Sequence, residues 1–376
     1  MMNYSILLIS TMFYSHILCN YLSIDYKKAT HRIYIDVKLN QSESDMHALV
    51  NTFLPFSLFE PSLKLNKKSA VKKSIDISLS YNKTYDQYTT SLSYHSLEID
   101  KYSFLYGDSS SFKPDNGFSF GHLFEDESFS IVHQLYNSHQ IKYKTFAFKS
   151  NLEHINGKIY FGGIPDDKDY QFKGYCKVDD TFPNWGCNLT QMKYNDTSVS
   201  FNNYALFHSG FYGLLYSDNV FDFIANVVFK NEIENKICYI EEISERRKGF
   251  NCQNSFKNEL TYEDTFEFVF GNIQIKYPKK LLFDDSSSIF FTNPYDYYLK
   301  YDIILGVDFI NSFNYTIFDY DNNQIGFYSD RISINMISNN NRENTIKSIL
   351  ILSLSLNAVD LILLLFIKQS YMNTLM

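Results

Sequence analysis

Residues 303–327 read IILGVDFINSFNYTIFDYDNNQIGF and carry the most informative pattern in the chain. Within this stretch, Tyr315–Tyr320 and Gln324–Tyr328 are rich in the aromatic and β-branched residues that favour strands. The polar residues 321–323 (DNN) separate the two runs and are typical of a turn. The stretch therefore predicts two consecutive β-strands.

Similar strand-like runs, separated by turn residues, recur towards the N-terminus. They are His31–Leu39, Ile75–Tyr81, Ser91–Ile99, Lys144–Phe148, Lys158–Phe161, Tyr204–Phe207, Thr265–Phe270, Ile273–Tyr277 and Ser288–Phe291. Helical patterns are few, and the clearest are Ser128–Ser138 and Ser217–Phe229, each of which begins at a serine suited to an N-cap. The pattern predicts an all-β protein with a few short helices, and its two halves echo one another loosely.

The composition favours a folded protein of two domains. The chain has 376 residues, among them 34 Phe and 31 Tyr, which is far more aromatic than a disordered protein. It has 34 Lys and Arg against 42 Asp and Glu, a formal charge of −8. Because no long basic run is present either, nucleic acid is not expected as a partner.

Residues 303–327 resemble a segment of the pepsin-like aspartic peptidases, in which ILG-x-x-FL precedes Y-x-V-F-D-x-x-N-x-x-I-G-F. Further segments resemble the family in its own order: IVHQL at 131–135, GKIYFGG at 157–163, and PNW at 183–185. The resemblance covers about residues 31–330. It implies a bilobal double-β-barrel, with an N-terminal lobe over residues 20–172 and a C-terminal lobe over residues 173–335.

The two catalytic triplets of the family are altered in this chain. Each lobe of a pepsin-like enzyme supplies one aspartate from a D-[TS]-G triplet, and the two aspartates share a proton and hold a water. The resemblance aligns these triplets with residues 51–53 (NTF) and 208–210 (HSG). Asn51 and His208 therefore stand where the family has its catalytic aspartates, and we call them the dyad positions.

The resemblance also assigns residues to a substrate-binding cleft between the lobes. They are Thr52, Tyr81, Ser209 and Gly210, with Tyr81 at the place of the family's flap tyrosine. Phe53 replaces a glycine of the first triplet, and residues 82–83 (NK) replace the glycine-rich tip of the flap. Trp185 is expected in the core.

The chemistry of the dyad positions predicts a catalytically inactive protein. A primary amide such as Asn51 is not a base near neutral pH, whereas His208 could act as a base but lacks an acid partner. We therefore expect a protein that binds a peptide or protein ligand in the interlobe cleft. The alternatives are a divergent endopeptidase that uses His208 and a structural surface protein. A true aspartate hidden by misalignment would be Asp45 or Asp218, but neither precedes a Thr/Ser-Gly pair.

Four cysteines follow the first segment of the chain: Cys176, Cys187, Cys238 and Cys252. Four cysteines allow three pairings, and the sequence alone does not choose among them. Pairing of nearest neighbours, Cys176–Cys187 and Cys238–Cys252, closes two short loops, and the resemblance places a disulfide of the family at the second pair. No CxxC motif or nearby His suggests a metal site, and no cofactor is expected.

Both ends of the chain carry membrane-targeting patterns. Residues 1–19 resemble a signal peptide. Residues 348–367, which follow a linker at 336–347, are long and apolar enough to cross a bilayer as a helix, and a GPI-type tail is the alternative. We expect a glycoprotein of the secretory pathway, anchored at the cell surface or an endomembrane with its lobes outside or lumenal. Beyond residue 19, its sequons are at Asn40, Asn82, Asn188, Asn195 and Asn314.

Overall fold

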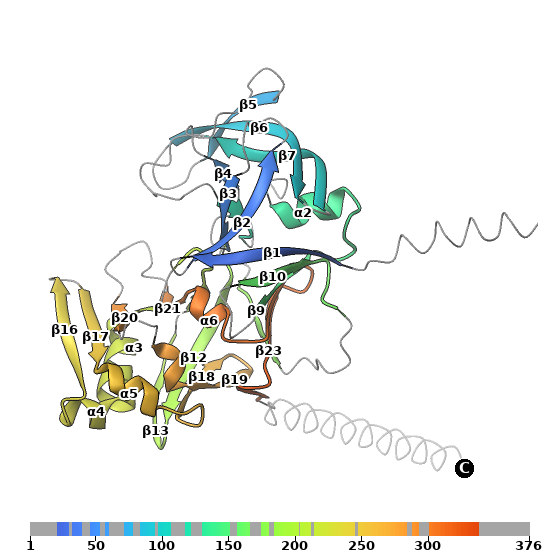
Figure 1. Cartoon of the computed structure of the whole chain (residues 1–376). Coiled ribbons are helices and arrows are strands. Elements are labelled where there is room, and N and C mark those ends of the chain that lie inside the picture. The colour runs from blue at the N-terminus through green and yellow to red at the C-terminus, as the bar shows by residue number, and fades with distance from the viewer. Residues whose placement is uncertain are drawn as a thin grey trace, which may run out of the picture. The chain divides into compact units, whose positions relative to one another are not determined.

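The computed structural model describes most of the chain between residues 21 and 337 (Figure 1). The described ranges are 21–29, 32–39, 46–52, 57–59, 71–77, 83–94, 97–106, 117–121, 130–150, 156–165, 174–179, 184–202, 204–211, 214–244, 247–283, 288–292 and 301–337. The chain divides into two compact units, Met1–Asn335 and Met336–Met376. The predicted signal peptide and membrane span lie outside the described residues, and within those residues no helix has the length and apolarity to cross a membrane.

The described strands form two large sheets, which confirms the expected all-β class. The first has 13 described strands in the order β11 (Gly174–Lys177), β23 (Gln324–Tyr328), β22 (Tyr315–Asp319), β9 (Thr145–Ser150), β10 (Asn156–Phe161), β1 (Leu22–Ala29), β2 (Arg32–Leu39), β3 (Met46–Asn51), β8 (Gly117–Ser119), β4 (Leu58–Phe59), β7 (Leu97–Tyr106), β6 (Lys83–Tyr94) and β5 (Val71–Ile77). The two strands predicted first, β22 and β23, pair with each other, and β22 also pairs with β9. Two strands from near the C-terminus are therefore built into the sheet of the N-terminal half, whereas the last described strand, β24 (Ser333–Met336), belongs to the second sheet.

The second sheet belongs to the C-terminal half. Its described strands follow the order β16 (Cys238–Ser244), β17 (Arg247–Cys252), β20 (Ser288–Thr292), β15 (Leu214–Tyr216), β21 (Tyr301–Leu305), β14 (Tyr204–Phe207), β12 (Gly186–Tyr194), β18 (Thr265–Phe270), β19 (Ile273–Pro278) and β24 (Ser333–Met336), and β13 (Thr197–Ser200) pairs with β12. The described helices are short: α2 (Ile131–Asn137), α3 (Asp218–Phe223), η2 (Ile224–Val228), α4 (Lys230–Glu234), α5 (Asn254–Glu259), η3 (Lys279–Leu282) and α6 (Val307–Ile310).

The two sheets repeat one arrangement of strands. In the first, β3 pairs in parallel with β8, β8 is antiparallel to β4, and β4 is parallel to β7. In the second, β14 is parallel to β21, β21 is antiparallel to β15, and β15 is parallel to β20. The strands β3 and β14, which lead to the two dyad positions, therefore occupy equivalent places in the two halves.

One predicted strand is wrong. Ser91–Ile99 spans the end of β6 and the start of β7, which pair as a hairpin with Leu92 opposite Ile99 and Tyr94 opposite Leu97. The apolar residues on both sides of the connection belong to neighbouring strands of the same sheet, so their spacing resembles a single strand. The predicted run Ile75–Tyr81 overlaps β5, and its continuation beyond Ile77 lies outside the described residues.

Both predicted helices are present. The first is α2, which follows Ser130. The second begins after Ser217 as α3 and continues through the π-helical turn η2 as far as Val228. At this point the ammonium of the buried Lys279 donates to the carbonyl of Val228 at 2.7 Å, a contact that accommodates the widened turn.

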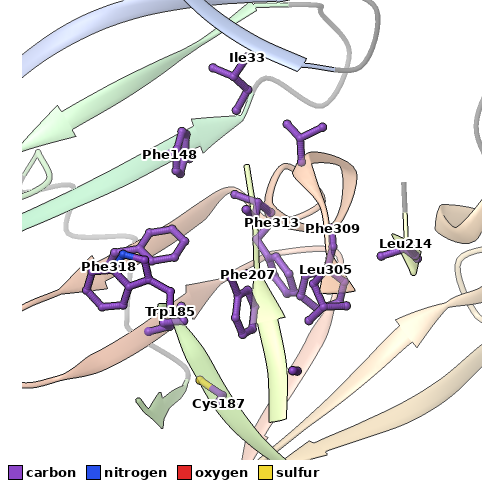
Figure 2. Close-up of a cluster of buried hydrophobic side chains, with 14 of the residues drawn as sticks. Ile33, Phe148, Trp185, Cys187, Phe207, Leu214, Leu305, Phe309, Phe313 and Phe318 are labelled. Carbon is purple, nitrogen blue, oxygen red and sulfur yellow. The ribbon is translucent and has the colours of Figure 1, made fainter. Parts of the chain in front are cut away.

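Aromatic side chains fill the core beneath the strands that carry the dyad positions. Trp185 is fully buried, as expected, and its ring packs edge-on against that of Phe318, with 5.1 Å between the ring centroids (Figure 2). Its indole N–H donates to the carbonyl of Phe120 at 2.6 Å. Because Trp185 precedes β12 and Phe120 follows β8, this contact joins the two sheets.

The four cysteines form the disulfides Cys176–Cys187 and Cys238–Cys252. The first links β11 of the 13-stranded sheet to β12 of the second sheet. The second joins directly opposite residues of the β16–β17 hairpin. The structure therefore contains the nearest-neighbour pairing.

Candidate functional site

The first dyad position is the last residue of β3. Asn51 pairs with Ser119 of the parallel strand β8, and its carbonyl accepts a hydrogen bond from the N–H of Phe120 at 2.8 Å. Val50 before it and Thr52 after it are fully buried, and Asn51 itself is 6% exposed. The run ALV at 48–50 thus produces a buried strand that carries a polar side chain to its end.

The second dyad position lies directly after β14. The N–H of His208 donates to the carbonyl of Leu305 on β21 at 2.9 Å, and the carbonyl of His208 accepts from the N–H of Phe211 at 3.0 Å. The buried run ALF at 205–207 therefore delivers His208 into a tight turn, just as β3 delivers Asn51. His208 is 7% exposed.

The residues after the dyad positions bind each other reciprocally. Thr52 Oγ1 donates to the carbonyl of Phe207 at 2.8 Å and accepts from the N–H of Ser209 at 2.8 Å. Ser209 Oγ donates to the carbonyl of Val50 at 2.8 Å and accepts from the N–H of Thr52 at 3.0 Å. We call Thr52 and Ser209 the hydroxyl pair. Its four hydrogen bonds are buried and hold the two turns in a symmetric arrangement.

Gly210 lies where the two dyad positions converge. A Cβ atom on Gly210 would lie 3.1 Å from Cε1 of His208 and 3.2 Å from Cγ and Nδ2 of Asn51. These distances are shorter than ordinary van der Waals contacts, so only glycine fits here without displacing a neighbour. The structure thus brings Asn51, His208 and Gly210 together, from two segments more than 150 residues apart in the sequence.

Burial determines the charge state of His208. Removal from water lowers the pKa of its imidazole from 6.5 to about 3, and the positive charge of Arg32 lowers the pKa further. His208 is therefore neutral above about pH 3, and the amide of Asn51 does not titrate. The dyad positions carry no charge at neutral pH, whereas two carboxylates that share a proton carry one negative charge.

The structure places the other candidate residues as follows. Tyr81 and Phe53 lie outside the described residues, and so does Asp45. Tyr81 belongs to the connection between β5 and β6, whose paired ends are Ile77 and Lys83. Asp218 is exposed in the first turn of α3, away from the strand end that carries His208.

Arg32 is the residue of this region that the sequence did not reveal. It is the first residue of β2, and its charge acts on His208. Its position could have been inferred from the pairing of β2 with β3, but only once the register was known. Within the described ranges, no group of three or more His, Cys, Asp or Glu side chains is placed to hold a metal ion.

Comparisons with known proteins agree with this arrangement. The model of the eukaryotic aspartyl protease family matches residues 116–329, more than half of the chain. Among solved structures, the chain is similar to an aspartic proteinase from Irpex lacteus at 17% identity and a TM-score of 0.56. That similarity covers 85% of this chain and 98% of the other, and at this identity it shows the fold alone. A comparison with curated proteins finds no match.

Proposed function

The chain belongs to the eukaryotic aspartyl protease family, and we propose that it is a catalytically inactive member that binds an extended peptide or protein segment between its two lobes. The observation that carries the proposal is the contrast between the hydroxyl pair and the dyad positions. Thr52 and Ser209 hold the two turns together with four buried hydrogen bonds. The residues that directly precede them in the sequence, however, are Asn51 and His208 and not the two aspartates of the family. The hydroxyl pair that holds the two turns is present, but the dyad positions carry an amide and an imidazole in place of a carboxylic acid and a carboxylate base.

Peptide hydrolysis by two carboxylates needs a base that takes a proton from water and an acid that gives one to the leaving nitrogen. The amide of Asn51 can perform neither step. With a pKa of about 3, the imidazole of His208 is a weak base, and it is neutral over most of the pH range. The amide of Asn51, which takes the place of the second carboxyl group, offers no proton to the leaving nitrogen of the peptide. This chemistry argues against the alternative of an endopeptidase that relies on His208.

The location of the protein is part of the proposal. A signal peptide at residues 1–19 and an anchor at 348–367 would place the lobes outside the cell or in the lumen of an endomembrane. The two disulfides fit an oxidising compartment. Two of the sequon asparagines, Asn188 and Asn195, are exposed and accessible to glycosylation, whereas Asn314 is half-buried and accepts a hydrogen bond from the N–H of Asp330.

Peptide retention by the purified full-length chain tests the proposal. We expect the chain to retain members of a random octapeptide mixture, and mass spectrometry should recover them uncut. Gly210→Ala should reduce retention several-fold, because the new methyl group presses on Asn51 and His208. Gly186→Ala is the matched control, since its Cβ would meet its neighbours at 3.5 Å or more.

The outcomes separate the three functions. Retention that Gly210→Ala weakens and Gly186→Ala does not would support peptide binding at the dyad positions. Cut peptides would identify an active endopeptidase instead. A folded chain that retains no peptide would contradict the proposal and favour a structural surface protein.

A further inference from the structure

The charge around the dyad positions has the opposite sign to that of a carboxylate dyad. Asn51 and His208 contribute no negative charge, and among the described residues it is the cation Arg32 whose charge acts on His208. A ligand group that binds at the dyad positions is therefore near the side-chain amide of Asn51 and the guanidinium of Arg32, both of which donate hydrogen bonds. An active aspartic site presents a carboxylate in the same place.

The pairing of β2 with β3 independently places Arg32 and Asn51 at the same end of the two strands. Tyr34 lies opposite Leu49, and Ile35 lies opposite Ala48. Tyr34 and Leu49 are the last pair of the two strands at this end, and Arg32, the first residue of β2, and Asn51, the last residue of β3, each lie two residues beyond it. Directly opposite residues of a sheet project from the same face, and so do residues two apart along one strand. Arg32 and Asn51 therefore share one face at the end of both strands.

We propose that Arg32, Asn51 and His208 form an anion site that binds a carboxylate of the peptide ligand. A guanidinium donates two parallel hydrogen bonds to a carboxylate, and the side-chain amide of Asn51 supplies another donor. Asn51 and His208 are more than 90% buried, which strengthens such bonds relative to those at an exposed surface. The carboxylate could come from an Asp or Glu side chain or from the C-terminus of the peptide.

The inference rests on the proposed peptide binding and names the class of peptide. The chain carries a net charge of −8, so its overall field repels acidic peptides. A preference for acidic peptides would consequently have to come from a local cationic site.

Binding of fluorescein-labelled octapeptides to the full-length chain tests the inference by fluorescence anisotropy at pH 7 and constant salt. One library has Asp at a fixed central position, and a second has Asn there, both with amidated C-termini and random residues elsewhere. A third has the central Asn and a free C-terminus. We expect at least tenfold tighter binding of the Asp library, or of the free C-terminus library, than of the neutral one.

Charge variants connect this preference to Arg32. Arg32→Gln should abolish the preference, whereas Arg331→Gln, which removes an exposed arginine outside the site, should keep it. Asn51→Asp is a nearly isosteric second variant that places a negative charge beside Arg32, and it should also abolish the preference if Arg32→Gln does not fold.

The result also distinguishes this inference from the proposed function. Equal binding of all three libraries would overturn the anion site and leave peptide binding intact, as would a preference that survives in folded Arg32→Gln or Asn51→Asp. Failure of every library to bind would contradict peptide binding itself, and the anion site with it.

Discussion

At the scale of single residues, the chemistry of the site depends on how deeply one imidazole is buried. His208 is almost removed from water at the end of β14, and this desolvation, together with the charge of Arg32, keeps its imidazole neutral. A neutral imidazole beside an amide can donate and accept hydrogen bonds, but it cannot share a proton as two carboxylates do. The dyad positions thus offer hydrogen-bonding groups to a ligand, as the proposed function requires.

The lowered pKa of His208 predicts a pH dependence of stability. Its pKa is about 3 in the folded chain and about 6.5 when unfolded, so between these values the unfolded state binds more protons. The stabilisation is complete above about pH 6.5 and is lost as the pH falls towards 3. On lowering the pH from 7 to 4.5, His208→Asn should lose about 2.5 kcal/mol less unfolding free energy than the wild type.

Guanidinium unfolding of both proteins at the two pH values measures this difference. His139→Asn is the matched control, because His139 is exposed and Asn tolerates its positive φ of 60°. Equal losses in the wild type and His208→Asn would show that burial does not hold His208 neutral.

At the scale of elements, the site depends on two equivalent strand ends. The turns after β3 and β14 meet through the hydroxyl pair, and each hydroxyl serves as both donor and acceptor to the opposite turn. Buried backbone groups of both turns thereby find partners across the boundary between the two sheets. The hydroxyl pair therefore has a structural role in joining the two turns, which does not itself require catalysis.

A double-mutant cycle on the hydroxyl pair tests this structural role. Thr52→Val and Ser209→Ala should each lower the unfolding free energy by about 2–3 kcal/mol, since each leaves buried backbone groups without a partner. Together they should cost at least about 1 kcal/mol less than the sum, because the loss of either hydroxyl already loosens the junction between the same two turns. Thr89→Val is the control. The Thr89 hydroxyl forms a partly buried hydrogen bond with the hydroxyl of Ser103, and losing it should lower the unfolding free energy by less than about 1 kcal/mol. Additive losses would refute the coupling of the two turns.

At the scale of the whole molecule, the two halves are joined by a disulfide and by a shared sheet. The chain enters the 13-stranded sheet at β1 and returns to it with β22 and β23, before its last described strand, β24, joins the second sheet. The disulfide Cys176–Cys187 and the contact of Trp185 with Phe120 add two further links between the sheets. These links hold the two strand ends that form the site in a fixed relation.

The all-β class was predictable from local patterns because strand spacing and turn residues are short-range signals. Several strands have the predicted limits, for example Tyr204–Phe207 and Thr265–Phe270. The hairpin at Ser91–Ile99 was missed because alternation alone does not mark a tight connection between paired strands. The proximity of Asn51 and His208 followed only from the family resemblance. Arg32 was missed because its place depends on a pairing register that no short motif encodes.

A cleavage assay shows whether this family member lacks peptidase activity, as proposed. The full-length chain, shown to be folded, is incubated with a random-peptide mixture from pH 3 to 8, with and without a pepstatin-type inhibitor, beside an active aspartic protease as positive control. We expect no new peptide termini from this chain at any pH, because Asn51 and His208 cannot act together as acid and base. Cleavage that disappears in His208→Ala would contradict this expectation and would show that a single imidazole suffices.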